Sequence, residues 1–328
     1  VPDMAFEKRV IDLRAALLGA LAGGSGTAPW NRDDFLRLAG ALARYACITE
    51  YIFDATDEET ARLDVMRQSF EKSPDSARAE DLAVFACYEL LGDLPFAPQL
   101  LAVCDSVPAL CPLADLQIRE RARLAEIAKS IPVFTSLDKG VSAQVRRQYE
   151  TFPYPRWSYL PPFVNADIQE RDLSPQGRWL VAGCGTGYEA ALAGLMMPGV
   201  NIDAMDLSRA SLSYAIARAQ DLGLQNITFA QGDILRLADR DDRYDYILSA
   251  GVLHHMSDLL AGWKVLRSIL KPKGLMRIAL YSEYGRQDIV AARAVIKEKG
   301  FAATRKGMKD FRRQMSALLP ADVCERLC

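Results

Sequence analysis

The chain has 328 residues, of which 50% are hydrophobic and 25% are charged, and its formal net charge is −2 at pH 7. This length allows about two domains of ordinary size, and the composition is typical of a globular protein. The near balance of charges excludes a global positive field that would attract nucleic acid or an anionic membrane surface.

Cysteine and histidine usage restricts the possible metal sites and compartments. The seven cysteines form no C-x-x-C pair, and the two histidines, His254 and His255, are adjacent, so we expect no metal. An odd, scattered set of cysteines favours a reducing compartment, and we expect a cytoplasmic protein. The longest uncharged run, residues 15–31, is broken by Gly, Ser and Pro, so we expect no membrane span. No signal peptide is recognisable, and a first residue other than Met is consistent with a fragment of a longer product.

The first part of the chain has the apolar spacing of helices. Between Phe35 and Phe53, apolar residues recur three or four positions apart, which predicts one amphipathic helix. Residues 57–60 have the acidic first turn of a second helix, and two more are predicted at 79–91 and 116–129. No strand alternation occurs here, so we expect an all-helical domain over residues 1–135.

Residues 136–165 have a different composition. Residues 141–150 predict a short helix, and Phe-Pro-Tyr-Pro-Arg-Trp follows at 152–157, with two further prolines at 161–162. Proline disfavours helix for itself and for the residue before it, so the stretch is expected to be extended. We expect it to be a linker or a lid.

After Gln176 the pattern changes to alternating strands and helices. Such alternation predicts a parallel sheet with helices on both faces, here a domain over residues 166–328. The predicted strands are 179–182, 201–205, 227–230, 244–249 and 275–280, and the helices between them are 189–196, 209–222 and 259–270. Further helices are predicted at 288–299 and 306–318.

The first predicted strand leads into a glycine-rich turn. Glycines at alternate positions permit positive φ and close approach of a ligand to the backbone. The third glycine of a dinucleotide-binding turn would fall on Tyr188, so that pattern fails, and a purely structural turn is the alternative. The observed spacing resembles the first motif of class I S-adenosylmethionine-dependent methyltransferases. That resemblance implies that the amino-acid part of the cofactor is held by Gly183, Cys184, Gly185, Thr186 and Gly187.

Acidic residues follow the second and third predicted strands. Asp206 stands 19 residues after Gly187, and the resemblance implies that it accepts hydrogen bonds from the ribose hydroxyls, with Leu207 beside it. A capping role for the following helix is the alternative. The resemblance also implies that Asp233 accepts from the adenine amino group and that Ile234 packs on the ring. A solvated turn is the alternative for Asp233.

The fourth predicted strand and the segment before the fifth extend the resemblance to residues 178–281. Ser249-Ala250-Gly251 and the Leu-His-His that follows are similar to the family's fourth-strand motif, and residues 270–274 match its usual turn. Four motifs in the family's order imply a Rossmann-like class I methyltransferase sheet, in an α/β chain with an N-terminal all-α domain. They also imply S-adenosylmethionine as cofactor and S-adenosylhomocysteine as product.

The sequence departs from the family at one position. Family members commonly carry an acid two residues before the first glycine, where this chain has Val181, so another group is expected to orient the cofactor's ammonium. We expect Tyr149, Tyr154 and Arg156 to form a lid over the methionine end, since an Arg fork can bind a carboxylate. The alternative is that these aromatics only pack the helices onto the sheet.

The proline-rich segment supports a narrower resemblance. Together with the glycine turn, it is similar to bacterial proteins in which tetratricopeptide-type repeats precede a methyltransferase domain. Residues 35–60 are similar to the segment between repeats and catalytic domain in those proteins.

His254 and His255 are the candidate catalytic residues, because histidine can act as a general base near neutral pH. The alternative is that they pack beneath the cofactor. The substrate cap in this fold is expected from residues 1–165 and 282–328. The two strands that usually follow the fifth are not evident, so either the chain is cut short or the sheet is smaller. Residues 297–313 carry seven basic and two acidic side chains, which favours a solvated helical face over a contact for RNA or an acidic partner.

We therefore expect a methyltransferase acting on an O or N atom of an unidentified acceptor, with a small molecule favoured and nucleic acid disfavoured. Two alternatives remain. One is a protein methyltransferase that docks a polypeptide partner on the helical domain. The other is a non-catalytic regulator or scaffold that binds the cofactor as a ligand.

Overall fold

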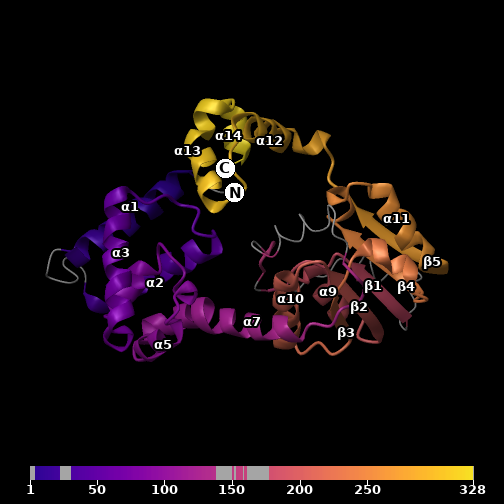
Figure 1. The fold of residues 1–328 in the computed structure, drawn as a ribbon, viewed down its shortest axis with the longest axis horizontal. Coiled ribbons are helices and arrows are strands. Elements are labelled where there is room, and N and C mark those ends of the chain that lie inside the picture. The colour runs from indigo at the N-terminus through magenta and orange to yellow at the C-terminus, as the bar shows by residue number, and fades with distance from the viewer. Residues whose placement is uncertain are drawn as a thin grey trace. The chain divides into compact units, whose positions relative to one another are not determined.

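A computed structural model describes residues 4–22, 31–137, 150, 153–157, 159–160 and 177–327. The chain forms two compact units, Val1–Ala122 with Glu283–Cys328, and Arg123–Ser282 (Figure 1). The boundaries predicted from the sequence divide the chain differently, because they assign residues 123–135 to the helices and 283–328 to the sheet.

The first unit is helical, as predicted. It contains α1 (Met4–Ala22), α2 (Arg32–Ile48), α3 (Asp57–Lys72), α4 (Ala79–Phe85), α5 (Ala97–Asp105), α6 (Cys111–Ala114), α12 (Gln287–Lys299), α13 (Arg305–Leu318) and α14 (Ala321–Leu327). Helix α7 (Glu120–Ser130) spans the boundary to the second unit. None of the helices in the described residues is both long and apolar enough to cross a bilayer.

Local capping and a buried amide shape the helical unit. Helix α3 begins at a capping box, in which Thr56 N donates to the Glu59 carboxylate and Glu59 N donates to Thr56 Oγ1. Gln117 is completely buried, and its amide accepts from Leu91 N at 3.0 Å and donates to Tyr51 Oη at 2.8 Å. Because these contacts satisfy its amide, Gln117 has a structural role.

Ion pairs join the C-terminal helices to the N-terminal ones within this unit. Arg312 contacts Glu7 at 2.5 Å, and Arg313 pairs with Asp54. Both arginines belong to the basic run predicted to be a solvated face, so part of that run is neutralised inside the unit.

The second unit is a five-stranded parallel sheet of order β3-β2-β1-β4-β5. Its strands are β1 (Gly177–Ala182), β2 (Val200–Asp206), β3 (Ile227–Gln231), β4 (Tyr244–Ala250) and β5 (Leu270–Ala279). The helices are α9 (Tyr188–Met196), α10 (Arg209–Asp221) and α11 (Leu259–Ser268). The five predicted strands and the Rossmann-like fold class are confirmed, and within the described residues no strand follows β5.

Both faces of the sheet are covered. Trp179 and Val181 of β1 pack into the cluster with α9 and α10, whereas Leu180 and Ala182 face the cluster that includes Leu266 of α11. Figure 1 shows the strands between these helices. Because its residues are buried alternately on two faces, the strand appears in the sequence as a continuous apolar run.

The start of β5 differs from the prediction. Residues 270–274 were expected to form a turn after a helix ending at Leu270, but they belong to the strand that pairs with β4. The pairing register shifts between Tyr244 and Tyr246, and Lys273 has φ of +66°. A bulge therefore accommodates the Lys-Pro-Lys-Gly stretch within the strand.

Candidate active site

A cavity of about 340 Å³ opens at the carboxyl ends of the strands, where ligands bind in open α/β sheets. Predicted site residues that line it are Gly183, Cys184, Gly185, Thr186, Asp206, Leu207, Asp233, Ile234, Ala250, Gly251, Tyr154 and His255. Gly187, Ser249, Arg156 and His254 are not among the lining residues, and Tyr149 lies outside the described residues.

The three glycines of the turn all have positive φ, of +75°, +52° and +83°. A Cβ on Gly183 would lie 2.5 Å from the Val252 side chain, and one on Gly187 would lie 2.5 Å from Ala215. On Gly185 it would meet nothing closer than 3.9 Å. The outer glycines therefore permit close packing, and the middle one leaves the backbone open to the cavity.

Asp206 joins the end of β2 to this turn. Its Oδ2 accepts from Gly185 N at 2.8 Å, and its Oδ1 accepts from Ser208 N at 2.9 Å. Burial raises the pKa of this carboxyl above the usual value for Asp. The cap of α10 is Ser208, whose side chain accepts from Ser211 N, so the capping alternative for Asp206 is wrong.

Asp233 lies in the loop after β3 and is only 2% exposed. Its Oδ1 accepts from Leu235 N at 3.0 Å, and its backbone N donates to Thr135 Oγ1 at 2.7 Å. Its Oδ2 has no hydrogen-bond partner in the part of the chain that the structure describes. The solvated-turn alternative is therefore wrong, and a buried acceptor beside the cavity is left for a ligand to satisfy.

Thr135 was missed by the sequence analysis. It follows a short segment that lies beside β3, where Val133 bridges to Gln231 and Phe134 N donates to Gln231 O at 2.7 Å. No signal in the sequence links these distant positions, since the contact depends on how α7 leads into the sheet unit.

The described part of the proline-rich segment, residues 153–157, is attached to the glycine turn. Trp157 Nε1 donates to Thr186 O at 2.9 Å, Thr186 Oγ1 donates to Pro155 O, and the Trp157 ring meets Tyr188 edge-on at 5.7 Å. Tyr154 lines the cavity and is 72% exposed, whereas Arg156 is exposed outside the lining. The lid role of Tyr149, Tyr154 and Arg156 stays a prediction.

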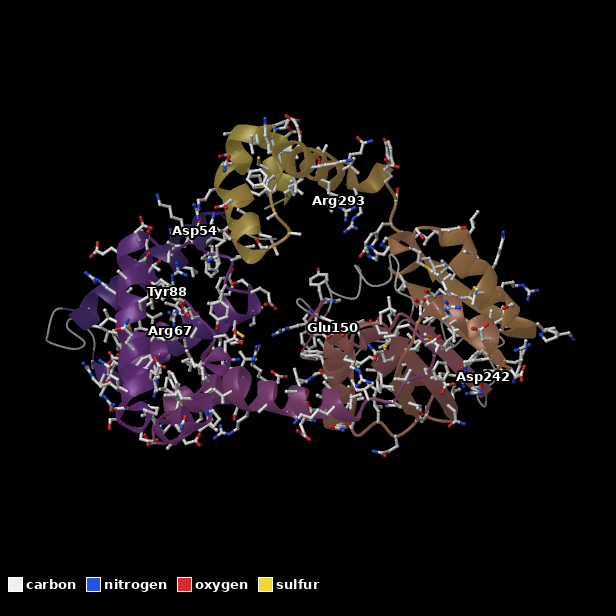
Figure 2. The ribbon with its side chains drawn as sticks, in the orientation of Figure 1. Asp54, Arg67, Tyr88, Glu150, Asp242 and Arg293 are labelled. Atoms are coloured by element: carbon white, nitrogen blue, oxygen red, sulfur yellow. The ribbon has the colours of Figure 1, made fainter. Side chains whose placement is uncertain are left out.

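Glu150, labelled in Figure 2, lies at the start of α10. Its carboxylate accepts from Arg209 N at 2.7 Å and from Ala210 N at 3.2 Å. A negative charge is favoured at the positive end of the helix dipole, so Glu150 ties its own segment to α10.

The opposite wall of the cavity distinguishes the two histidines. His255 lines the cavity together with Tyr281, whereas the His254 ring lies 4.1 Å from the Tyr281 ring and 4.2 Å from the His255 ring. Tyr281 was missed, although its position just after the fifth strand places it at the ligand-binding edge. This arrangement favours His255 over His254 as a group that reaches a substrate.

The charges around the cavity are of one sign. Its described lining includes the carboxylates of Glu189, Asp206 and Asp233 and no Lys or Arg. Such a lining favours a ligand that carries positive charge. Within the described residues, no group of three or more His, Cys, Asp or Glu side chains is arranged to hold a metal ion.

Comparison with known proteins agrees with this geometry. Residues 173–316 match a family model described as a methyltransferase domain. The match covers less than half of the 328-residue chain. The match supports the predicted methyltransferase class, whereas the resemblance to proteins with tetratricopeptide-type repeats stays a prediction.

Relatives of this chain include proteins of several bacteria. An uncharacterised Synechococcus protein is 30% identical over 171 residues, covering 48% of this chain and 41% of the relative. The malonyl-[acyl-carrier protein] O-methyltransferase of Halalkalibacterium halodurans is 32% identical over 123 residues, covering 36% of this chain and 44% of the relative. The crystal structure of YcgJ from Bacillus subtilis aligns with a TM-score of 0.33 at 24% identity, covering 39% of this chain and 56% of that one. The chain thus spans less than half the length of these two curated relatives.

Proposed function

We propose that the methyltransferase domain binds S-adenosylmethionine in this cavity and transfers its methyl group to an O or N atom of a small molecule. The observation that carries the proposal is the buried Asp233 Oδ2, which lacks a partner in the described residues and lies at a cavity walled by the glycine turn. The sulfonium cofactor supplies an electrophilic methyl group and a good leaving group.

Each wall of the cavity suits one part of that cofactor. Asp233 Oδ2 would accept from the adenine amino group, and Ile234 would pack on the ring. Asp206, already fixed by two backbone amides, keeps lone pairs for the ribose hydroxyls. The open backbone at Gly185 would face the amino-acid end.

Methyl transfer needs alignment and exclusion of water more than it needs acid or base catalysis. The glycine turn and the acids would fix one reactant, and Tyr154, Met256 and Tyr281 would border the other. If the acceptor loses a proton, a ring nitrogen of His255 is the group placed to take it. His254, whose ring lies near the rings of both His255 and Tyr281, would position these neighbours.

Calorimetry on the full chain with S-adenosylmethionine and S-adenosylhomocysteine tests the proposal. We expect both compounds to bind, and binding of neither would contradict it. Isotope transfer from labelled S-adenosylmethionine to fractionated lysate then separates the acceptor classes. Label in the small-molecule fraction is expected, label only in protein would indicate a protein methyltransferase, and binding without transfer would indicate a regulator or scaffold.

With an acceptor in hand, His255→Ala and His254→Ala form a matched pair. We expect His255→Ala to lower kcat about 100-fold for an acceptor that loses a proton, the usual scale of general-base catalysis. His254→Ala should have a smaller effect. Full turnover by His255→Ala would remove the base role.

A further inference from the structure

The cavity offers an unexplained carboxylate beside an apolar strand end. Val181 is the β1 residue two positions before the first glycine, and it is buried and lines the cavity. A valine cannot neutralise the ammonium of an amino-acid ligand. Any counter-charge at this end must therefore come from another element.

Two of the three lining carboxylates are already assigned. Asp206 accepts from two backbone amides, and Asp233 accepts from Leu235 N in the loop after β3, where the adenine would bind. Glu189 is half-buried and makes no hydrogen bond or ion pair with the residues that the structure describes, although burial, together with the charge of Glu189, raises the pKa of the neighbouring Tyr246. It is therefore the carboxylate that remains available.

Glu189 also lies at the same end of the cavity as Val181. It is the second residue of α9, two positions after Gly187, and it lines the cavity together with Val181 and Leu248. These last two residues are partners in the register of β1 and β4. The helix dipole favours a carboxylate in the first turn of a helix, so this position suits an acid that faces a cationic ligand.

We propose that Glu189 binds the ammonium group of the cofactor's amino-acid end, and so replaces the acid missing at position 181. This inference rests on the proposed function. A charge-assisted hydrogen bond in a partly closed cavity contributes more than a neutral one, and it would help to select a ligand with an intact amino-acid end.

A competing arrangement exists on the other side of the same side chain. Glu189 also borders a smaller hollow lined by Tyr246 and Arg277. If the carboxylate turned towards Arg277, it would stabilise the sheet rather than the ligand. The test must therefore separate a loss of ligand contact from a loss of structure.

Glu189→Gln makes that separation when two ligands are compared by calorimetry. S-adenosylhomocysteine has the amino-acid end, and 5′-methylthioadenosine lacks it. We expect the affinity for S-adenosylhomocysteine to fall about 10-fold or more, and the affinity for 5′-methylthioadenosine to stay unchanged. The exposed Glu126→Gln, on α7 of the same unit, is the matched control and should change neither affinity.

A second variant tests the same idea in the opposite direction. Val181→Asp in the Glu189→Gln background should recover part of the affinity for S-adenosylhomocysteine, because it places a carboxylate at the end of β1 that can bind the ammonium group instead. An unchanged affinity in Glu189→Gln, or an equal loss for both ligands, would overturn the role of Glu189 while leaving the proposed function intact. A wild-type chain that binds neither ligand would overturn both.

Discussion

The two ends of the parallel strands treat their acids in opposite ways. Towards the amino ends, Arg178 contacts Asp203 at 2.7 Å and pairs with Asp242, labelled in Figure 2, while Lys271 contacts Asp245 at 2.8 Å. At the carboxyl ends, the described lining of the cavity includes three acids and no Lys or Arg. Acids with cationic partners hold the sheet together, whereas acids without them are suited to a cationic ligand.

The largest effect is expected where the carboxyl end is most crowded. In Gly187→Ala the alanine would have to keep the left-handed backbone conformation of Gly187, and its Cβ would clash with Ala215. We therefore expect the free energy of unfolding to fall by about 2–4 kcal/mol. Gly223→Ala is the matched control, because Gly223 has φ of +68° but open space around it. Its expected loss is about 1 kcal/mol, the backbone cost alone. Equal losses in denaturant unfolding would show that crowding at the turn contributes nothing.

Asp233→Asn tests the carboxyl ends of the strands alone, because it changes an acid of the cavity and leaves the ion pairs of Arg178 and Lys271 intact. The amide can keep the contact with Leu235 N but places a donor where Oδ2 stood. We expect the affinity for S-adenosylhomocysteine to fall about 10-fold, with the unfolding free energy within about 0.5 kcal/mol of wild type. Calorimetry and denaturant unfolding measure the two quantities. A variant that unfolds more easily yet binds normally would make Asp233 a structural acid.

Arg178→Gln is expected to give the converse result. Loss of the guanidinium leaves Asp203 and Asp242 with fewer partners, so the unfolding free energy should fall by about 1 kcal/mol. The affinity for S-adenosylhomocysteine should not change. The exposed Arg236→Gln serves as control for charge removal within the same unit. If Arg178→Gln weakened ligand binding while its stability was kept, the two ends would not be separable.

The smallest effect concerns pH. Hydrogen bonds from Arg178 N and Lys271 hold the pKa of Asp245 below its usual value, so its ionised form contributes stability that is lost as the pH falls through the lowered pKa. Burial raises the pKa of Asp206, so its ionisation lowers stability as the pH rises from the ordinary value through the raised one. The measurement is the unfolding free energy as a function of pH in the acid range. Asp245→Asn should lose the fall in stability with falling pH that Asp245 causes, and Asp206→Asn should lose the fall in stability with rising pH that Asp206 causes. Identical pH profiles for both variants would contradict these directions.

The sequence was sufficient for elements that depend on local pattern. Parallel strands buried on both faces appear as apolar runs, and residues at or just after the ends of such strands, such as Asp206 and Asp233, fall at the ligand-binding edge. The bulge at Lys273 was not predictable, because the same Lys-Pro-Lys-Gly letters suit a turn equally well.

Features that depend on distant contacts were also beyond the sequence. Thr135 reaches the backbone of Asp233 across 98 positions, and Arg312 reaches Glu7 across 305. His254 and His255 are adjacent residues of the same chemistry, so the sequence cannot distinguish them, and only the structure shows that His255 and not His254 lines the cavity. Which of two neighbouring side chains faces a cavity is decided by tertiary structure.

The hydrogen bond between the Trp157 indole and Thr186 O has a practical consequence. It couples an intrinsic fluorophore to the backbone of the glycine turn, so any occupant that shifts the turn should alter the indole emission. Titration of the unlabelled chain would then follow occupancy directly, and Trp157→Phe would identify the signal among the four tryptophans.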